Sequence, residues 1–351
     1  MKFENLKHKH NFHISTFNFQ LSTMIQFIKM HGIGNDYIYL DCIANPMPSN
    51  IEQFARHASD RHTGIGGDGV VLILPSNIAD CQMRMFNADG TEGRMCGNAI
   101  RCVGKYYYET YIIKTQNARH KMQDNCEICI MNYELSVETL SGIKHLTLHL
   151  NNNTVESVTV DMGIPSLQPS DIPILTDTPF INQQISIETQ YDANAPYCPP
   201  VLGGRAQRAE GVNNSSLLTP HSSFKGTAVS MGNPHLILPI DDIDNYPLHQ
   251  LGPLWERHPL FPDRVNTEIV QQISPTHLHM RVWERGSGET LACGTGACAV
   301  VVAFTHLGRT QKNTPITVSL RGGDLTITYR NDNHVLMQGT ATEVFRGTIN
   351  F

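Results

Sequence analysis

Short runs of apolar and β-branched residues recur along the whole chain. The runs at 70–74, 146–150, 155–160 and 316–320 are rich in valine, isoleucine, leucine and threonine, and most are flanked by Gly, Asn, Asp or Pro. Such runs predict β-strands, because branched side chains suit a pleated surface and the flanking residues favour turns. The best helical segments are 51–61, 97–111, 248–258 and 294–307. Many strands and few helices predict an α+β fold.

Two of these helices follow the same short motif. Cys96 and Cys293 each stand four residues after a glutamate and directly before a glycine, and a run of small, apolar residues comes next. A helix that is apolar around its circumference has to be buried. We therefore expect each of these two helices to be wrapped by a curved, mainly antiparallel sheet.

The repeat extends well upstream of the cysteines. Asn35 lies in the segment Gly-Asn-Asp and precedes Cys96 by 61 residues, while Asn233 lies in Gly-Asn-Pro and precedes Cys293 by 60. Two matched motifs at nearly equal spacing indicate a duplicated domain, and repeats of this length form similar lobes rather than a solenoid. The sequence thus predicts two pseudo-symmetric lobes.

The bulk composition narrows the possible partners. A chain of 351 residues suggests about two domains. The net charge of −6 without a basic run argues against nucleic acid or an anionic membrane as partner. Because no apolar stretch is long enough to span a bilayer and the first 23 residues do not resemble an export signal, we expect a cytoplasmic protein whose nine cysteines are reduced.

The expected organisation has a tail and two lobes. Residues 1–23 form a tail ahead of Met24, and residues 24–161 form the N-terminal lobe, completed by a strand from 340–351. Residues 162–339 form the C-terminal lobe. The stretch 165–226 is irregular and proline-rich, and we interpret part of it, within an insertion at 175–225, as a long surface loop.

Two further motifs have structural explanations. Gly64–Gly69 fits the dinucleotide pattern G-x-G-x-x-G, but a helix precedes it and a strand follows, the reverse of the order that phosphate binding needs. We expect a tight turn near the substrate. Cys126 and Cys129 have the C-x-x-C spacing of zinc or redox sites, but no second ligand pair is near, and ordinary strand residues are the better interpretation.

The paired cysteines are the main candidates for chemistry. A thiol at a helix N-terminus is stabilised as a thiolate by unpaired N–H groups and the helix dipole, which lower its pKa toward neutrality. Two such thiols facing one substrate would supply the opposed proton acceptor and donor that inversion of a carbon centre requires. His235 and Glu284 are further acid–base candidates.

At this point the chain resembles the diaminopimelate epimerase family from about Met24 to the C-terminus. The resemblance is carried by these blocks, in the family's order: 29–36 (KMHGIGND), 86–90 (FNADG), 95–98 (MCGN), 231–235 (MGNPH), 264–266 (RVN), 284–290 (ERGSGET) and 292–296 (ACGTG). It implies two similar lobes with the active site in the cleft between them. It also implies a homodimer and interconversion of LL- and meso-diaminopimelate, a step toward lysine and peptidoglycan, without a cofactor or a metal.

The resemblance assigns roles by position. Cys96 and Cys293 would be the catalytic acid and base, with His235 and Glu284 close by to tune them. Glu284 and Arg285 would also bind the distal end of the substrate. The other substrate-binding residues would be the following: Asn35, Asn87, Asn233 and Asn266 at the distal amino-acid end, and Gly97, Asn98, Gly294 and Thr295 at the reacting α-carboxylate.

Two other classes of protein could also explain the paired cysteines. A proline racemase-like enzyme also uses paired cysteines, although the Glu284-Arg285 block and the asparagines favour a substrate with a second amino-acid head. A non-catalytic binding protein or thiol–disulfide oxidoreductase would need Cys126 and Cys129 exposed and redox-active. Position 69 is glycine where some members of the family have a substrate-contacting glutamine.

Overall fold

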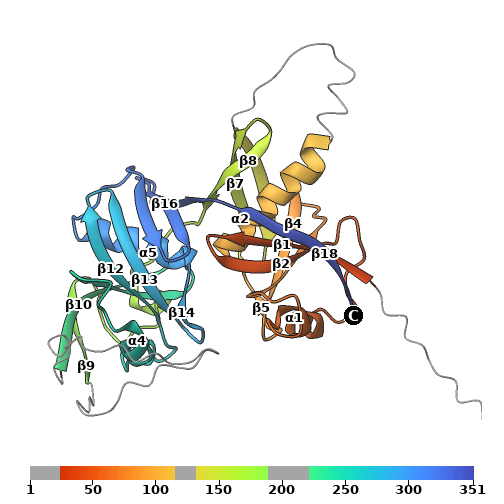
Figure 1. Cartoon of the computed structure of the whole chain (residues 1–351). Coiled ribbons are helices and arrows are strands. Elements are labelled where there is room, and N and C mark those ends of the chain that lie inside the picture. Colours follow the sequence, from red (N-terminus) through yellow and green to blue (C-terminus); the bar gives the residue numbers. More distant parts are fainter. Residues whose placement is uncertain (1–23, 115–131, 189–220) are drawn as a thin grey trace, which may run out of the picture.

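The computed structural model describes residues 24–114, 132–188 and 221–351. Figure 1 shows two lobes, one red to yellow and the other green to blue, with strands that run from one to the other. The N-terminal lobe contains β1 (Met24–Gly32), β2 (Asn35–Asp41), α1 (Ile51–Ser59), β3 (Gly69–Leu74), β4 (Cys81–Asn87), β5 (Glu92–Gly93), α2 (Gly97–Tyr107), the π-helical turn η1 (Tyr108–Ile112), β6 (Asn132–Thr139), β7 (Gly142–Asn151), β8 (Thr154–Asp161) and the last strand, β18 (Thr342–Asn350).

The C-terminal lobe repeats this succession of elements. It contains the 3₁₀ turn η2 (Pro169–Asp171), β9 (Gln183–Glu188), β10 (His221–Ser230), β11 (Pro234–Pro239), α4 (Leu248–Glu256), β12 (Asn266–Ser274), β13 (His277–Glu284), β14 (Gly288–Thr290), α5 (Gly294–His306), β15 (Ile316–Leu320), β16 (Gly323–Tyr329) and β17 (Val335–Gly339). The four helices expected from sequence are all present, with ends within a few residues of the predicted ones.

Strand pairing is equivalent in the two lobes. In the N-terminal lobe β1–β2 is antiparallel, β2–β3 parallel, β3–β4 antiparallel, β4–β6 parallel, and β6–β7 and β7–β8 antiparallel. The series β10–β11, β11–β12, β12–β13, β13–β15, β15–β16 and β16–β17 has the same directions in the same order. The prediction of two pseudo-symmetric α+β lobes is therefore confirmed.

Two pairings tie the lobes together. β8 pairs antiparallel with β17, the corresponding strand of the other lobe. β9 lies beside β10, whereas the equivalent place beside β1 is taken by β18, from the other end of the chain. Figure 1 shows β18, in dark blue, alongside the red β1. The N-terminal lobe thus depends on backbone hydrogen bonds to residues more than three hundred positions away.

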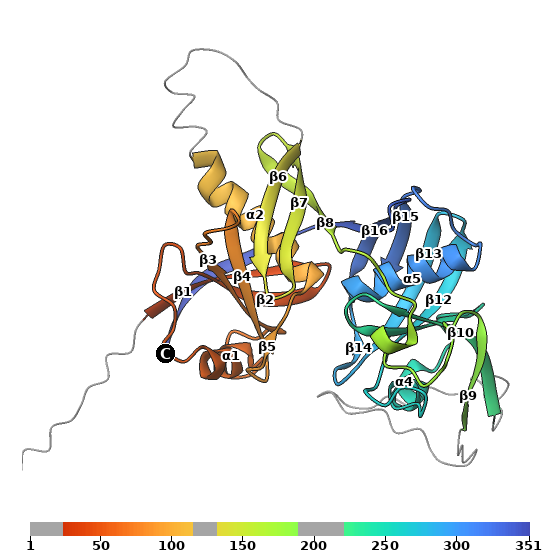
Figure 2. The same ribbon diagram turned by 180° about the vertical axis from the view of Figure 1, so that it is seen from behind.

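The helices that follow the cysteines are packed inside these sheets. Figure 2 shows α2 among the N-terminal strands and α5 against the C-terminal ones. α5 contacts β10, β11, β12, β16 and β17, and its alanine and valine side chains are fully buried. α2 differs from the expectation of an apolar circumference, since it buries Asn98 and the cationic Arg101.

Several other sequence predictions can be compared with the described residues. α1 precedes Gly64–Gly69 and β3 follows it, and a Cβ on Gly64 would lie 2.2 Å from the His57 carbonyl oxygen, so the segment is a tight turn. Within 165–226, residues 183–188 and 221–226 form strands rather than loop, while 189–220 lie outside the described residues. Residues 1–23, Cys126 and Cys129 also lie outside them. Among the described helices, none has the length and hydropathy needed to cross a bilayer.

Candidate active site

The two cysteines are N-cap residues of equivalent helices. Cys96 precedes α2 and Cys293 precedes α5, both with extended backbone. The two helix starts meet around Met337: a Cβ on Gly97 would lie 2.5 Å from Met337 Cε, and one on Gly294 would lie 2.9 Å from Met337 Sδ. Glycine after each cysteine is therefore needed for this close packing.

A cavity of about 990 Å³ lies where the lobes meet, and both cysteines line it. Ten of the thirteen site residues expected from sequence are on its wall: Asn35, Cys96, Gly97, Asn98, Asn233, Glu284, Arg285, Cys293, Gly294 and Thr295. The sequence motifs from the two lobes are thus brought to one cleft.

The other three residues lie around this cavity. Asn87 lines an adjoining cavity of about 1080 Å³, whose wall shares Asn35, Glu284 and Arg285 with the first. Asn266 and His235 are buried, and each bonds to a residue of the wall. They are placed to support the wall rather than to line it.

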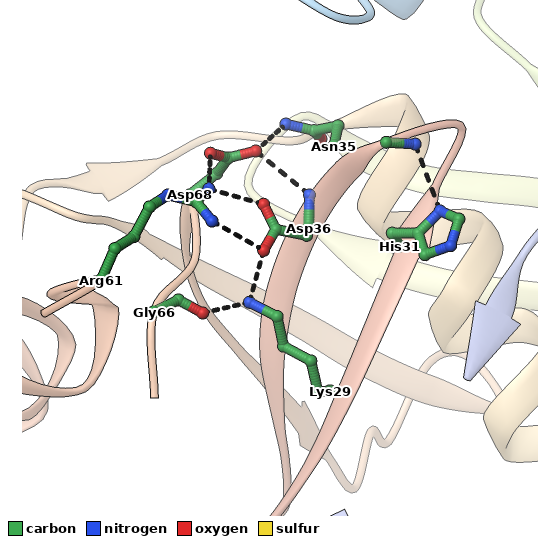
Figure 3. Close-up of polar contacts among 8 residues, drawn as sticks. Lys29, His31, Asn35, Asp36, Arg61, Gly66 and Asp68 are labelled. Carbon is green, nitrogen blue, oxygen red and sulfur yellow. Dashed lines mark hydrogen bonds and ion pairs between the residues drawn. The ribbon is translucent and has the colours of Figure 1, made fainter. Parts of the chain in front are cut away.

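Cys96 is half-buried and is joined to a network of charged groups. Its thiol donates to Asn35 Oδ1 over 3.5 Å, and Asn35 Nδ2 donates to Asp68 Oδ2 over 2.6 Å. Asp68 also accepts from Arg61 at 2.9 Å. Figure 3 shows Asn35 and Arg61 on either side of the Asp68 carboxylate. The orientation of the Asn35 amide is therefore fixed by a neighbouring carboxylate.

The same network holds the loop that carries Asp68. Arg61 donates to both oxygens of Asp36, and Lys29 forms an ion pair with Asp36 and donates to the carbonyl oxygen of Gly66. Burial and the negative charge of Asp36 raise the pKa of Asp68. The arginine is more than half exposed, so solvent weakens its contribution to stability.

Cys293 is joined to a different set of side chains. Its Sγ accepts from the Gly296 N–H over 3.4 Å and lies 3.5 Å from Thr295 Oγ1. Asn233 Nδ2 donates to Thr295 Oγ1 over 3.3 Å, and the Asn233 amide oxygen lies 3.1 Å from His235 Nε2. His235 Nδ1 in turn lies 2.6 Å from Glu268 Oε1. The chain of contacts thus ends in a fully buried carboxylate.

The acidity of the two thiols differs from the expectation. Burial raises the pKa of Cys96, and the N–H groups of Ala99 and Asn98 lower it by less. Burial raises the pKa of Cys293 well above its ordinary value, and the charges of Glu284 and Glu268 raise it further. The prediction that helix N-termini bring both pKa values toward neutrality is wrong for this structure, because desolvation outweighs the amides.

Glu284 and Arg285 sit at the end of β13. Glu284 accepts from Thr290 Oγ1 over 2.5 Å, and burial raises the pKa of its carboxyl group. The Arg285 N–H donates to Asn266 Oδ1 over 2.8 Å, and its guanidinium donates to the Asp263 carbonyl over 2.9 Å. Asn266 therefore fixes the backbone of Arg285.

Sequence reasoning missed four residues that support the cysteines: Tyr37, Asp68, Arg101 and Glu268. Asp68 lies in the glycine-rich segment 64–69, whose sequence indicates a turn and gives no sign of a carboxylate that contacts Asn35. Arg101 carries a usable signal, since it is a charged residue inside a run of small, apolar residues, whereas Glu268 stands in a strand that also contains Asn, Thr, Gln and Ser. Buried charges are rare and call for a partner or a function. Tyr37 offered no comparable signal.

His235, Glu268 and Cys293 could in principle hold a metal, since one ligand atom from each lies within 4.8 Å of the others. Zinc favours such donors at about 2.0–2.3 Å in a tetrahedron, which keeps ligand atoms more than about 3 Å apart. His235 Nδ1 and Glu268 Oε1 are only 2.6 Å apart and already form a hydrogen bond. The cluster is accounted for by that bond.

Comparison with known proteins identifies the family. The model of the family described as diaminopimelate epimerase matches residues 27–168 and 227–344. Proteins named diaminopimelate epimerase from Methanococcus maripaludis and Acetivibrio thermocellus are each 44% identical, over 93% of this chain and 99% and 98% of theirs. The one from Bacillus pumilus is 40% identical over 93% of this chain and 99% of its own.

Solved structures show the same fold at much lower identity. A hydroxyproline epimerase from Agrobacterium vitis is 13% identical, with a TM-score of 0.56 over 93% of this chain and 91% of that one. A probable proline racemase from Agrobacterium radiobacter is 13% identical, with a TM-score of 0.59 over 93% of each chain. These likenesses support the two-lobed architecture alone.

Proposed function

This chain belongs to the diaminopimelate epimerase family, and from that premise we propose that it interconverts LL- and meso-diaminopimelate with Cys96 and Cys293 as the two acid–base groups. The reaction supplies a precursor of lysine and peptidoglycan. The observation that carries the proposal is the single cavity lined by both cysteines, each at the start of a buried helix.

The two thiols divide the proton transfer between them. One, as thiolate, takes the α-proton, and the other, as thiol, delivers a proton to the opposite face of the same carbon. In the reverse direction they exchange roles. General acid–base catalysis of this kind contributes roughly 10²–10⁴-fold in rate. Because both thiol pKa values are raised, the pKa of the thiol that acts as base has to fall when the substrate binds. The substrate's α-ammonium group has this effect, since a nearby positive charge favours a thiolate.

The helix N-termini stabilise the charge that develops on the substrate. As the proton leaves, negative charge spreads into the α-carboxylate. The N–H groups at the helix starts that follow Cys96 and Cys293, at Gly97-Asn98 and Gly294-Thr295, are suited to bind that group. This stabilisation needs no cofactor as an electron sink.

The second amino-acid head of the substrate fits the polar wall beyond the thiols. Asn35, Asn233, Glu284 and Arg285 lie on that wall, and Asn87 lines the adjoining cavity. We assign these residues, with the supporting Asn266, to binding the distal centre. A substrate with a single head, such as proline, would make none of these distal contacts and would lose their contribution to binding.

Deuterium exchange tests this function directly. The full-length chain is incubated in deuterium oxide with LL-diaminopimelate, and with L-proline as control, and the α-positions are followed by NMR. We expect deuterium to enter diaminopimelate as the meso isomer forms, and proline to stay unlabelled. Labelling of proline with none in diaminopimelate would refute the proposal in favour of a racemase of simple amino acids.

We further propose a homodimer in the cytoplasm, with a domain division at 24–161 plus 340–351 and at 162–339. The edge strand β18 exposes Val344 and Phe345, which suits an interface with a second copy. The cysteines that the structure describes are free, as a reducing compartment would keep them. Light scattering during gel filtration tests the dimer: the mass of one chain would contradict it.

A further inference from the structure

Arg101 is a cation buried completely inside the N-terminal lobe, with 0% of its surface exposed. Its guanidinium donates to the Gly97 carbonyl over 3.1 Å, to Asn98 Oδ1 over 3.0 Å and to the Thr340 carbonyl over 3.2 Å. These acceptors are uncharged, and within the described ranges no carboxylate forms an ion pair with Arg101. A buried charge without a counter-ion is costly, so its presence needs an explanation.

The fold makes room for this guanidinium. A Cβ on Gly32 would lie 2.8 Å from Arg101 Nη2, and one on Gly339 would lie 3.1 Å from Arg101 Cζ. Gly32 belongs to β1 and Gly339 to β17, so strands of both lobes form the compartment. Both positions would clash with a larger residue, which shows that the compartment is part of the fold.

The compartment lies under the first turn of α2, which begins directly after Cys96. The positive charge of Arg101 lowers the pKa of the Cys96 thiol, against the larger effect of burial. The residue at the same offset from Cys293 is Cys298, which is uncharged. The C-terminal lobe thus has no cation at the position of Arg101.

Cys293 lies instead beside a buried carboxylate. Glu268 is 0% exposed, and its Oε1 lies 2.6 Å from His235 Nδ1. Among the described residues Glu268 Oε2 has no hydrogen-bond partner. A Cβ on Gly296, whose N–H donates to Cys293 Sγ, would lie 2.5 Å from Glu268 Oε1. The negative charge of Glu268 raises the pKa of Cys293.

The other titratable groups around the thiols leave the contrast in place between a buried cation near Cys96 and a buried carboxylate near Cys293. Glu284 of β13 raises the pKa of both thiols. Tyr37 of β2 is a neutral hydrogen-bonding partner of Cys96, and its own pKa is raised well above the ordinary value, chiefly by burial. His235 hydrogen-bonds to Glu268, and Thr295 to Cys293. Arg101 and Glu268 are therefore the buried charges that distinguish the two sites.

We propose that Arg101 and Glu268 are positioning residues that set which thiol ionises first: Cys96 loses its proton before Cys293 does. The proposal rests on the two-cysteine function and specifies it. In the first turnover Cys96 accepts the α-proton and Cys293 gives its proton to the opposite face. Proton exchange with solvent, or the reverse reaction, then restores the resting state.

Alkylation of the full-length enzyme without substrate tests the assignment. The rate of iodoacetamide labelling at each cysteine is measured by mass spectrometry of the two peptides, from about pH 6 to about pH 11, a range that spans the ordinary thiol pKa. The midpoint of each curve is compared rather than the rate, since access to the thiols differs. We expect the Cys96 midpoint to lie below that of Cys293 by about one pH unit or more. A lower midpoint for Cys293 would overturn the proposal.

Substitutions assign the difference to the two charges. Arg101→Gln should raise the Cys96 midpoint and leave that of Cys293 in place, and Arg101→Lys should restore it. Glu268→Gln should lower the Cys293 midpoint. Arg330→Gln removes an exposed cation that lines neither cavity and should change neither midpoint. Unmoved midpoints in both Arg101→Gln and Glu268→Gln would refute the role of these charges.

Two controls keep the outcomes separate. If circular dichroism shows that Arg101→Gln does not fold, the wild-type midpoints and Glu268→Gln still decide the question. Labelling needs no turnover, so its result does not depend on deuterium exchange. Failure of exchange with the expected midpoints would refute the proposed function alone, and exchange with inverted midpoints would refute this assignment alone.

Discussion

The two lobes share a backbone but support their cysteines with different side chains. By strand register, Tyr37 in the N-terminal lobe corresponds to His235 in the C-terminal lobe, because each stands two residues after the matched asparagine and pairs with the first residue of the next strand. By the same register Val71 corresponds to Glu268. The apolar position of one lobe is thus a buried carboxylate in the other.

The register also relates the residues that end the next strands. Gly69, the first residue of β3, pairs with Asn87. Asn266, the first residue of β12, holds the equivalent position, one residue before the pair formed by Thr267 and Trp283. Residue 69, glycine here, therefore corresponds to an asparagine that fixes the backbone of Arg285. Duplication kept the strands and the Cys-Gly junctions, while the side chains around the cleft diverged. A substrate that is itself chiral needs that asymmetry.

An ion pair was retained in both lobes, in different surroundings. Arg84 contacts both oxygens of Glu92 at 2.6 and 3.1 Å, and Arg281 contacts those of Glu289 at 2.8 and 3.1 Å. Each arginine stands eight residues before its glutamate. The side chain of Glu92 is 30% exposed and that of Glu289 is 1% exposed. The same ion pair is therefore partly exposed in the N-terminal lobe and buried at its glutamate in the C-terminal lobe.

The largest expected effect, on kcat/KM, comes from replacing the cysteine that each lobe places at the start of its buried helix. Cys96→Ser and Cys293→Ser should each lower kcat/KM for diaminopimelate by about 10³-fold or more, because a serine hydroxyl is a far weaker acid than a thiol and forms almost no anion to act as the base. NMR of deuterium entry measures the loss. If one variant kept normal turnover, the lobes would not be catalytic equals and a one-base mechanism would be required.

Much of this equivalence was predictable from local sequence. The Cys-Gly junctions, the asparagines and the four helices are contiguous motifs, and their spacing revealed the duplication. The sequence predicts that a strand from 340–351 completes the N-terminal lobe, but the pairing of this strand with β1 and the contact between Asp68 and Asn35 join residues far apart in the chain, which periodicity does not specify. The predicted direction of the thiol pKa shifts is wrong because the desolvation of Cys96 and Cys293 comes from tertiary packing, which the local sequence does not show.

The retained ion pair gives the next largest effect, this time on stability. Glu289→Gln should lower the free energy of unfolding by about 3 kcal/mol, since it removes a buried carboxylate that pairs with Arg281, Arg321 and His249. Glu92→Gln should cost less than about 1 kcal/mol, because that pair is partly exposed and screened. Urea denaturation of the two variants measures both. Equal losses would mean that the surroundings of the pair do not matter.

A smaller effect is expected from the carboxylate that orients Asn35. Asp68→Ala removes the 2.6 Å contact to Asn35 Nδ2 and should lower kcat/KM by about 10-fold, the usual value of a charge-assisted hydrogen bond. The matched control is Asp60→Asn in the same loop, whose side chain accepts hydrogen bonds from its neighbours His62 and Thr63. Steady-state kinetics should leave this control within about twofold of the wild type, a neutral change. Similar losses in both would point to general loop damage.

The smallest and most discriminating effect concerns pH. A thiol is neutral when protonated, so a raised pKa means that little thiolate exists near neutrality, and kcat/KM should rise with pH on the alkaline side before falling as the second thiol ionises. The two limbs report the pair, not single residues. Because the negative charge of Glu268 raises the pKa of Cys293, Glu268→Gln should move the falling limb to lower pH by about one unit or less and leave the rising limb in place. A rate profile in which both limbs move together would mean that the lobes do not hold their thiols independently.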